Sequence, residues 1–84
     1  MPAISMFYGI LIYMYLTSKD HRPPHIHAFY GNLEAVFLIS DGSLINGKFP
    51  KKGIAMVREF ILKYQKELMD MWDTERYYKL PPLE

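Results

Sequence analysis

The hydrophobic pattern of this chain changes its period near Pro50, and this change limits the folds that are open to it. Before Pro50, apolar residues alternate along short runs separated by turn residues, which is typical of β-strands. After Pro50, apolar residues recur at three- and four-residue steps, as they do on one face of a helix. This helical stripe consists of Ile54, Val57, Ile61, Tyr64, Leu68 and Trp72, and is widened by Met56 and Phe60. The pattern predicts an α+β fold, an antiparallel meander of about four strands packed by one long C-terminal helix.

Length and composition fit a single domain covering residues 1–84. The chain has 84 residues, which is enough for one hydrophobic core. Half of the residues are hydrophobic, so intrinsic disorder is not expected. The sequence contains no cysteine, which excludes disulfides and thiolate metal ligands. A formal net charge of +1 argues against an obligate nucleic-acid-binding protein, for which a strongly basic domain is expected.

Residues 5–16 alternate two largely apolar sets and therefore predict one buried central strand. One of its faces is aromatic, with Phe7, Tyr13 and Tyr15. If nothing covers this face, we expect it to contact another chain. If a terminal segment of the chain covers it, the face belongs to the core. The apolar stretch lacks a basic leader and is shorter than the about 20 residues that span a bilayer as a helix. We therefore expect a cytoplasmic protein that does not bind membranes.

Residues 25–30 and 33–39 predict a hairpin joined by Gly31-Asn32, where glycine in the first loop position suits a type II′ turn. A turn this tight sets the register of the two strands. On the side expected to meet the helix, it pairs Tyr30 with Leu33, Ala28 with Ala35, and Ile26 with Phe37. On the other side it places Phe29 opposite Glu34 and His27 opposite Val36, so that His25, His27 and Glu34 share this second face.

The remaining elements follow from turn and helix signals. Asp41-Gly42 predicts a turn before a short fourth strand at residues 43–46. Pro50 fits the first turn of the helix, which we expect to fade near Tyr77 or Tyr78. Pro81-Pro82 should end any regular structure.

All histidines of the chain lie between His21 and His27. Because residues two apart on a strand point the same way, His25 and His27 could reach one ion or one ligand. Adding His21 or Glu34 would complete the three ligands of an open zinc-like or two-histidine, one-carboxylate site. The candidate metal ligands are therefore His25, His27 and Glu34. The alternative is a set of polar residues on the wet face of a sheet, so no cofactor is expected unless a divalent metal binds here.

A second group of candidates is basic. Lys48, Lys51 and Lys52 cluster at the start of the predicted helix, although its dipole favours anions there. A phosphate or an acidic partner could bind at this point, and the alternative is a solvated surface. General acid–base catalysis would use His25 or His27, and a small ribonuclease would combine His25 with Lys51. No cysteine, serine elbow or phosphate-binding glycine loop supplies a recognisable nucleophile or cradle.

Several segments resemble a small bacterial family called domain of unknown function 4160. They are Met1-Pro2-Ala3-Ile4-Ser5, Phe7-Tyr8-Gly9-Ile10, Pro23-Pro24-His25-Ile26-His27-Ala28, Met71-Trp72 and Pro81-Pro82-Leu83. The resemblance implies a short stand-alone bacterial protein. Such proteins are often encoded beside a second small family, domain of unknown function 2442, in pairs that look like toxin–antitoxin or regulatory modules. It implies no catalytic residues. Some related chains carry a helix-turn-helix segment, which this sequence lacks.

Two functions remain open from the sequence. The first is a binding or regulatory module that acts with a partner similar to domain of unknown function 2442, or as a homo-oligomer; nucleic acid is the other partner class left open. The second is a small metal-dependent hydrolase or ribonuclease built on the His25-Ile26-His27 strand. The candidate ligand- or partner-binding residues are His21, Arg22, His25, His27, Glu34, Lys48, Lys51 and Lys52.

Overall fold

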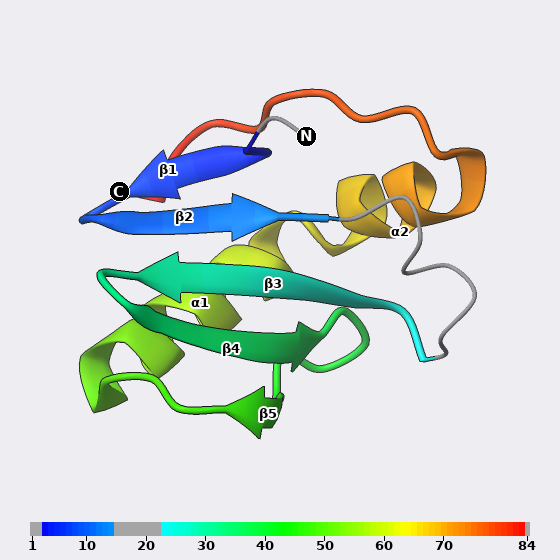
Figure 1. Cartoon of the computed structure of the whole chain (residues 1–84). Helices are drawn as coiled ribbons and strands as arrows, with labels where there is room; N and C mark the ends of the chain where they lie inside the picture. Colours follow the sequence, from blue (N-terminus) through cyan, green and yellow to red (C-terminus); the bar gives the residue numbers. More distant parts are fainter. Residues whose placement is uncertain (1–2, 15–22, 84) are drawn as a thin grey trace.

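The computed structural model describes residues 3–14 and 23–83. In these residues, five strands form one antiparallel sheet in sequence order, followed by two helices (Figure 1). The elements are β1 (Ser5–Phe7), β2 (Ile10–Tyr13), β3 (His25–Tyr30), β4 (Leu33–Leu38), β5 (Leu44–Gly47), α1 (Lys51–Lys63) and α2 (Gln65–Thr74). The predicted α+β meander is confirmed, with one strand more than expected and two helices in place of one.

The extra strand arises because the chain reverses at Tyr8-Gly9. These residues have φ angles of +51° and +79°, the signs of a type I′ hairpin turn. Phe7 pairs with Ile10, so both side chains face the core, with 5% and 1% of their surface exposed. The predictions of one strand over residues 5–16 and of Phe7 on the second face are therefore wrong, because the apolar alternation continues unchanged through the turn. Residues 15 and 16 lie outside the described part.

The hairpin of β3 and β4 has the predicted register. Each expected pair is present, from Ile26 with Phe37 at one end to Tyr30 with Leu33 at the turn. Gly31 has a φ of +60°, as the first position of a type II′ turn requires. The side facing the helices is apolar and closed, since Ile26, Ala28, Ala35 and Phe37 have no exposed surface.

The fourth predicted strand is β5, shifted by one residue. It follows the expected Asp41-Gly42 turn, where the Asp41 carboxylate accepts hydrogen bonds from the Ser43 amide at 2.9 Å and from the Ser43 hydroxyl at 2.7 Å. Its pairing with β4 is irregular beside Val36 and Phe37, so Ile45 is an extra residue on this edge. Gly47, at φ +85°, sits so close to the Glu34 carbonyl that a Cβ there would collide with it.

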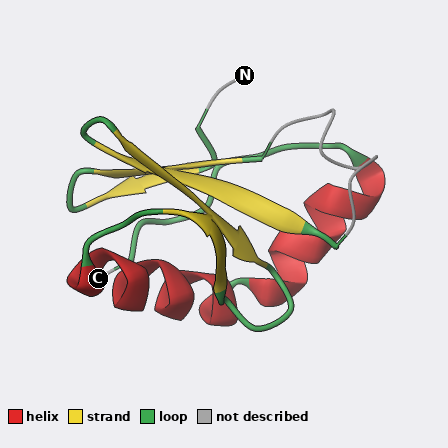
Figure 2. Ribbon diagram, turned by 60° about the horizontal axis from the view of Figure 1, so that its bottom comes forward, coloured by secondary structure: helices red, strands yellow, loops and turns green. Residues whose placement is uncertain are grey.

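The predicted helix is interrupted at Tyr64, whose φ and ψ of −113° and 28° are not helical. α1 begins directly after Pro50, as expected, and α2 begins at Gln65, whose side-chain amide donates to the Ile39 carbonyl at 2.8 Å. α2 ends at Thr74, earlier than predicted, because Glu75 adopts a left-handed conformation. Both helices lie on the same face of the sheet (Figure 2). Neither helix in the described residues is long and apolar enough to cross a membrane.

The C-terminal segment after α2 returns along β1 without regular secondary structure (Figure 1). Its Leu80 amide donates to the Ile4 carbonyl at 2.8 Å, and Leu80 and Leu83 are buried in the core. The absence of regular structure at Pro81-Pro82 is confirmed. The segment covers the β1 edge of the sheet, which would otherwise present unpaired backbone groups.

Candidate functional site

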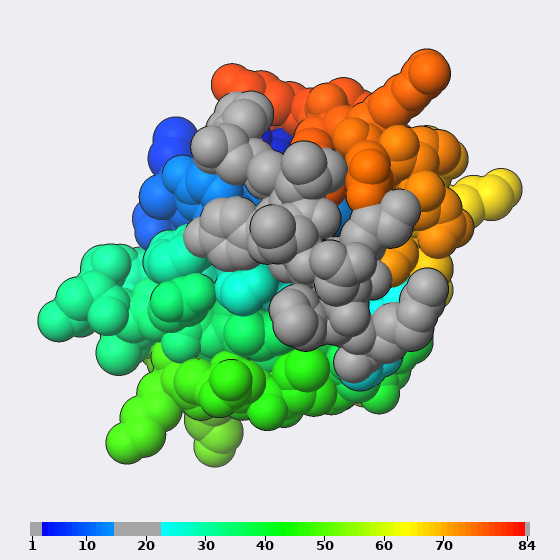
Figure 3. Space-filling view, turned by 45° about the vertical axis from the view of Figure 1, so that its right-hand side comes forward, coloured from blue at the N-terminus to red at the C-terminus, as the bar shows by residue number. Residues whose placement is uncertain are grey.

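The face of the sheet opposite α1 and α2, called here the helix-free face, carries His25 and His27 of β3. Its side chains alternate with the buried ones along each strand and are partly exposed. Figure 3 views the described strands from this side, with β3 in cyan and β4 in green. The helix-free face includes Leu11, Tyr13, His27, Phe29, Glu34 and Val36. Tyr13 and Phe29 meet edge to face, with ring centroids 5.4 Å apart.

His25 and His27 lie together, as the register predicted. Their ring centroids are 5.3 Å apart. His25 also packs against Trp72 of α2 at 5.3 Å, and its Nδ1 lies 2.9 Å from the Pro23 carbonyl oxygen. These contacts hold the His25 ring against both His27 and Trp72, so this residue has a clear packing role.

His27 is paired with the carboxylate of Glu34. Its Nδ1 lies 3.2 Å from Glu34 Oε2, and the side chains are 17% and 50% exposed. Burial lowers the pKa of His27 below its ordinary value, and the nearby His25 adds to this effect. The hydrogen bond and the negative charge of Glu34 act in the opposite direction but do not outweigh burial. The imidazole is therefore neutral at pH 7, donating from Nδ1 to the carboxylate and carrying its lone pair on Nε2.

A shallow cavity of about 310 Å³ opens beside this pair. Its walls come from three adjacent strands, β3, β4 and β5. They are His27, Glu34, Val36, Asn46 and Gly47. Asn46 was not predicted as a site residue, because its position depends on the irregular pairing of β5, which no sequence signal indicates. The cavity offers an imidazole, a carboxylate and an amide to a ligand or to a partner side chain.

The described residues bring no three histidine, cysteine or acidic side chains close enough to hold a metal ion. Glu34 is already bonded to His27, and Nδ1 of His25 faces a backbone carbonyl. His21 and Arg22 lie outside the described residues. Metal binding by His25, His27 and Glu34 therefore stays a prediction that would require Glu34 or the rings to turn.

The predicted basic residues lie elsewhere. Lys48, Lys51 and Lys52 are exposed near the start of α1, which has neither an acidic residue in its first turn nor a side-chain cap. α1 begins at the end of the sheet that carries the β1–β2 and β3–β4 turns, whereas β3 begins at the opposite end (Figure 1). The structure therefore does not bring Lys51 to His25.

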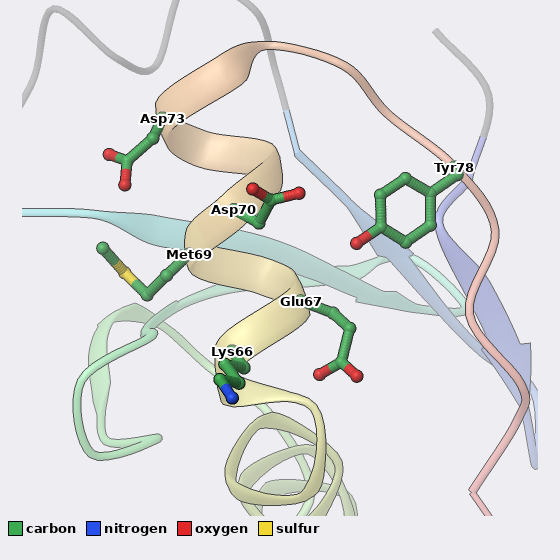
Figure 4. A pocket seen from close by; sticks show the side chains of 6 residues that line it. All are labelled: Lys66, Glu67, Met69, Asp70, Asp73 and Tyr78. Atoms are coloured by element: carbon green, nitrogen blue, oxygen red, sulfur yellow. The ribbon is translucent and has the colours of Figure 1, made fainter.

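A wider hollow of about 480 Å³ lies between α2 and the C-terminal segment (Figure 4). The carboxylates of Glu67 and Asp70 and the Tyr78 ring point into it. Loss of hydration raises the pKa of the Tyr78 phenol, and the negative charges of Asp70 and Glu67 raise it further. None of the predicted site residues lines this hollow.

Fold and site together define a small α+β protein in which a meander sheet has two helices on one face and a histidine–carboxylate pair on the other. The family model for "Domain of unknown function (DUF4160)" matches residues 9–73, and the chain belongs to this family. The match includes β2 to β5, α1 and most of α2, and therefore the whole histidine–carboxylate pair. No curated protein and no solved structure shows significant similarity to the chain.

Proposed function

We propose that this protein is a binding module of a paired-gene regulatory system, and that it holds its partner protein on the helix-free face. One observation carries the proposal: partly exposed apolar side chains of β2, β3 and β4 lie on this face beside a cavity that His27 and Glu34 help to line. Leu11, Tyr13, Phe29 and Val36 supply the apolar surface, while His27 and Glu34 supply polar groups. Protein interfaces combine aromatic anchors with a few well-placed hydrogen-bonding groups in the same way.

The proposed partner is a small protein encoded beside this one, similar to domain of unknown function 2442, as in toxin–antitoxin pairs. A second copy of the chain is the other candidate. Two features support a binding role: the sequence contains no cysteine, and no serine elbow supplies a nucleophile. The described residues of the helix-free face are also not covered by either helix (Figure 2).

Co-expression with the neighbouring gene product, followed by size-exclusion chromatography with light scattering, tests the proposal. We expect a stable complex of defined stoichiometry. Phe29→Ala should weaken it at least about tenfold, because a central aromatic anchor is lost. Leu62→Ala is the matched control, since Leu62 is an exposed apolar residue of α1, 49% exposed, outside this face. A monomer in the presence of the neighbouring protein and at high concentration would refute the proposal.

The His27–Glu34 pair favours a second candidate, a small hydrolase or ribonuclease. A neutral imidazole oriented by a carboxylate can accept a proton at Nε2 from water or from a ribose hydroxyl, and the carboxylate stabilises the imidazolium that forms. If a metal were held by His25, His27 and Glu34, it would supply Lewis acidity. The route described here needs only the protein's own residues.

The pH dependence of cleavage tests this candidate. Glu34 raises the pKa of His27, so Glu34→Gln should move the acidic limb of the rate profile to lower pH. His27→Gln should abolish that limb and reduce the rate by about 100-fold or more. Cleavage of RNA or ester substrates that is unchanged in His27→Gln, or absent from pure wild-type protein, would remove this candidate.

A further inference from the structure

We infer that a third pocket, at the opposite end of the sheet from His25, binds a nucleotide. This pocket has a volume of about 260 Å³, close to the lower limit of about 300 Å³ for small-molecule sites. It lies where the tips of the two hairpins meet the start of α1. The residues that line it include Tyr8, Tyr30, Ile10, Met56 and Lys52. All of these residues are distinct from the helix-free face.

The two tyrosine rings provide the surface for a base. Tyr8 and Tyr30 are 64% and 44% exposed, which is high for large aromatic side chains. Exposed aromatic faces stack on nucleobases regardless of base identity. Tyr30 meets Phe49 edge to face, with ring centroids 6.3 Å apart, and this contact helps to hold its ring in place.

Gly9 leaves room for the Tyr30 ring, and Gly53 leaves room for the Phe49 ring that Tyr30 contacts. A Cβ on Gly9 would lie 3.2 Å from Cε1 of Tyr30, and a Cβ on Gly53 would lie 2.9 Å from two ring carbons of Phe49. Larger residues at either position would push the rings from their places. The local backbone therefore maintains the shape of the pocket.

The charge around the pocket selects an anionic ligand. Lys52 lines the pocket, Lys48 and Lys51 are exposed close to it in sequence, and the first turn of α1 has no acidic residue. An acidic peptide with an apolar side chain is the other ligand whose negative charge could pair with Lys52. Two flat exposed rings favour the flat base of a nucleotide over a peptide side chain, with the phosphate at the lysines.

The backbone conformation of Tyr8 is energetically unfavourable for this residue type. Its left-handed backbone conformation suits glycine or asparagine and is disfavoured for a bulky residue. The substitution Tyr8→Asn would keep the hairpin turn and lose the ring. It therefore separates folding from binding.

Titration of ¹⁵N-labelled protein with adenosine 5′-monophosphate tests the inference. We expect saturable shifts of the Gly9, Lys52 and Gly53 amides. Adenosine and inorganic phosphate, tested separately, should each bind more weakly, because each supplies half of the ligand. Hexaadenylate RNA is a further probe, which distinguishes a site for a free nucleotide from a site for the end of an RNA strand. If the RNA binds more tightly than adenosine monophosphate, the site is assigned to single-stranded RNA.

Variants make the test decisive. Tyr8→Asn should raise the dissociation constant about tenfold or more, and Lys52→Gln should raise it severalfold and reduce its salt dependence. Lys66→Gln, which removes the same charge beside the other hollow, should have no effect. The inference fails if adenosine monophosphate does not bind up to about 10 mM, if Tyr8→Asn binds it equally well, or if only the peptide Glu-Glu-Leu-Glu-Glu shifts these amides.

Discussion

The two faces of the sheet differ in what their side chains do, although neighbouring residues of one strand supply both. On the covered face, Ala28 and Phe37 have no exposed surface and belong to a continuous core with the helices. On the helix-free face, His27 and Val36 are only partly buried, and a cavity opens between the strands. One step along a strand therefore moves a side chain from tight packing to a surface that a ligand can reach.

This difference shows how a small domain can present polar side chains to ligands on one face of its sheet while the other face remains packed in the core. Close-packed side chains tolerate little change in volume, whereas half-buried ones exchange contacts with water. Substitutions on the covered face should therefore act on stability, and those on the helix-free face should act mainly on binding or catalysis. The following measurements test that division.

The largest change in the free energy of unfolding is expected from a comparison of two adjacent residues that lie on opposite faces. Phe37→Ala should lower the free energy of unfolding by about 3–5 kcal/mol, because it removes a fully buried ring and leaves a cavity. Val36→Ala, its neighbour on the helix-free face, should cost about 1 kcal/mol or less. Urea denaturation followed by circular dichroism measures both. Similar costs for the two variants would show that the helix-free face is packed as tightly as the core.

Gly47, which borders the cavity beside His27, should be an exception to this division. Gly47→Ala should lower the free energy of unfolding by about 2–4 kcal/mol, because the new Cβ would collide with the Glu34 carbonyl and the backbone is left-handed. Gly31→Ala is the matched control: its φ is also positive, yet nothing lies within 4 Å of the added Cβ. It should cost only about 1–2 kcal/mol. Equal losses in denaturation midpoints would mean that the backbone conformation alone, and not the close approach of β4, requires Gly47.

A substitution at the hairpin tip should increase stability. Tyr8→Asn should raise the free energy of unfolding by about 1 kcal/mol, since asparagine accepts the left-handed conformation more readily than tyrosine. Thermal unfolding of the variant beside the wild type measures the change. A loss of stability would show that the Tyr8 ring contributes packing that outweighs its backbone cost.

The smallest effect concerns pH and His27. Its folded pKa lies below the ordinary value of 6.5, so the unfolded chain binds more protons than the folded chain as the pH falls below that value. The contribution of His27 to stability is therefore complete above pH 6.5 and decreases as the pH falls towards the folded pKa. Unfolding free energies from pH 8 to pH 5 should fall less in His27→Gln than in wild type. A steeper fall in the variant would mean that Glu34 outweighs burial and raises the pKa.

The β3–β4 hairpin and its site could be predicted because their signals are local. Gly31-Asn32 selects a tight turn, the turn sets the register, and the register places His27 diagonal to Glu34. The hairpin at Tyr8-Gly9 was missed because tyrosine is unusual in a left-handed turn position and the apolar alternation shows no break. The interruption at Tyr64 was missed because neither glycine nor proline marks it.

The α+β class, the start of the helical half at Pro50 and the shared face of His25, His27 and Glu34 could all be inferred from the order of residues. Each depends on spacing or turn chemistry within a few residues. The packing of Trp72 on His25, the approach of Asn46 to the cavity and the hydrogen bond of Leu80 to β1 became visible only in the folded molecule. Those contacts join residues far apart in the chain, and their energies depend on which apolar surfaces meet, which no local pattern records.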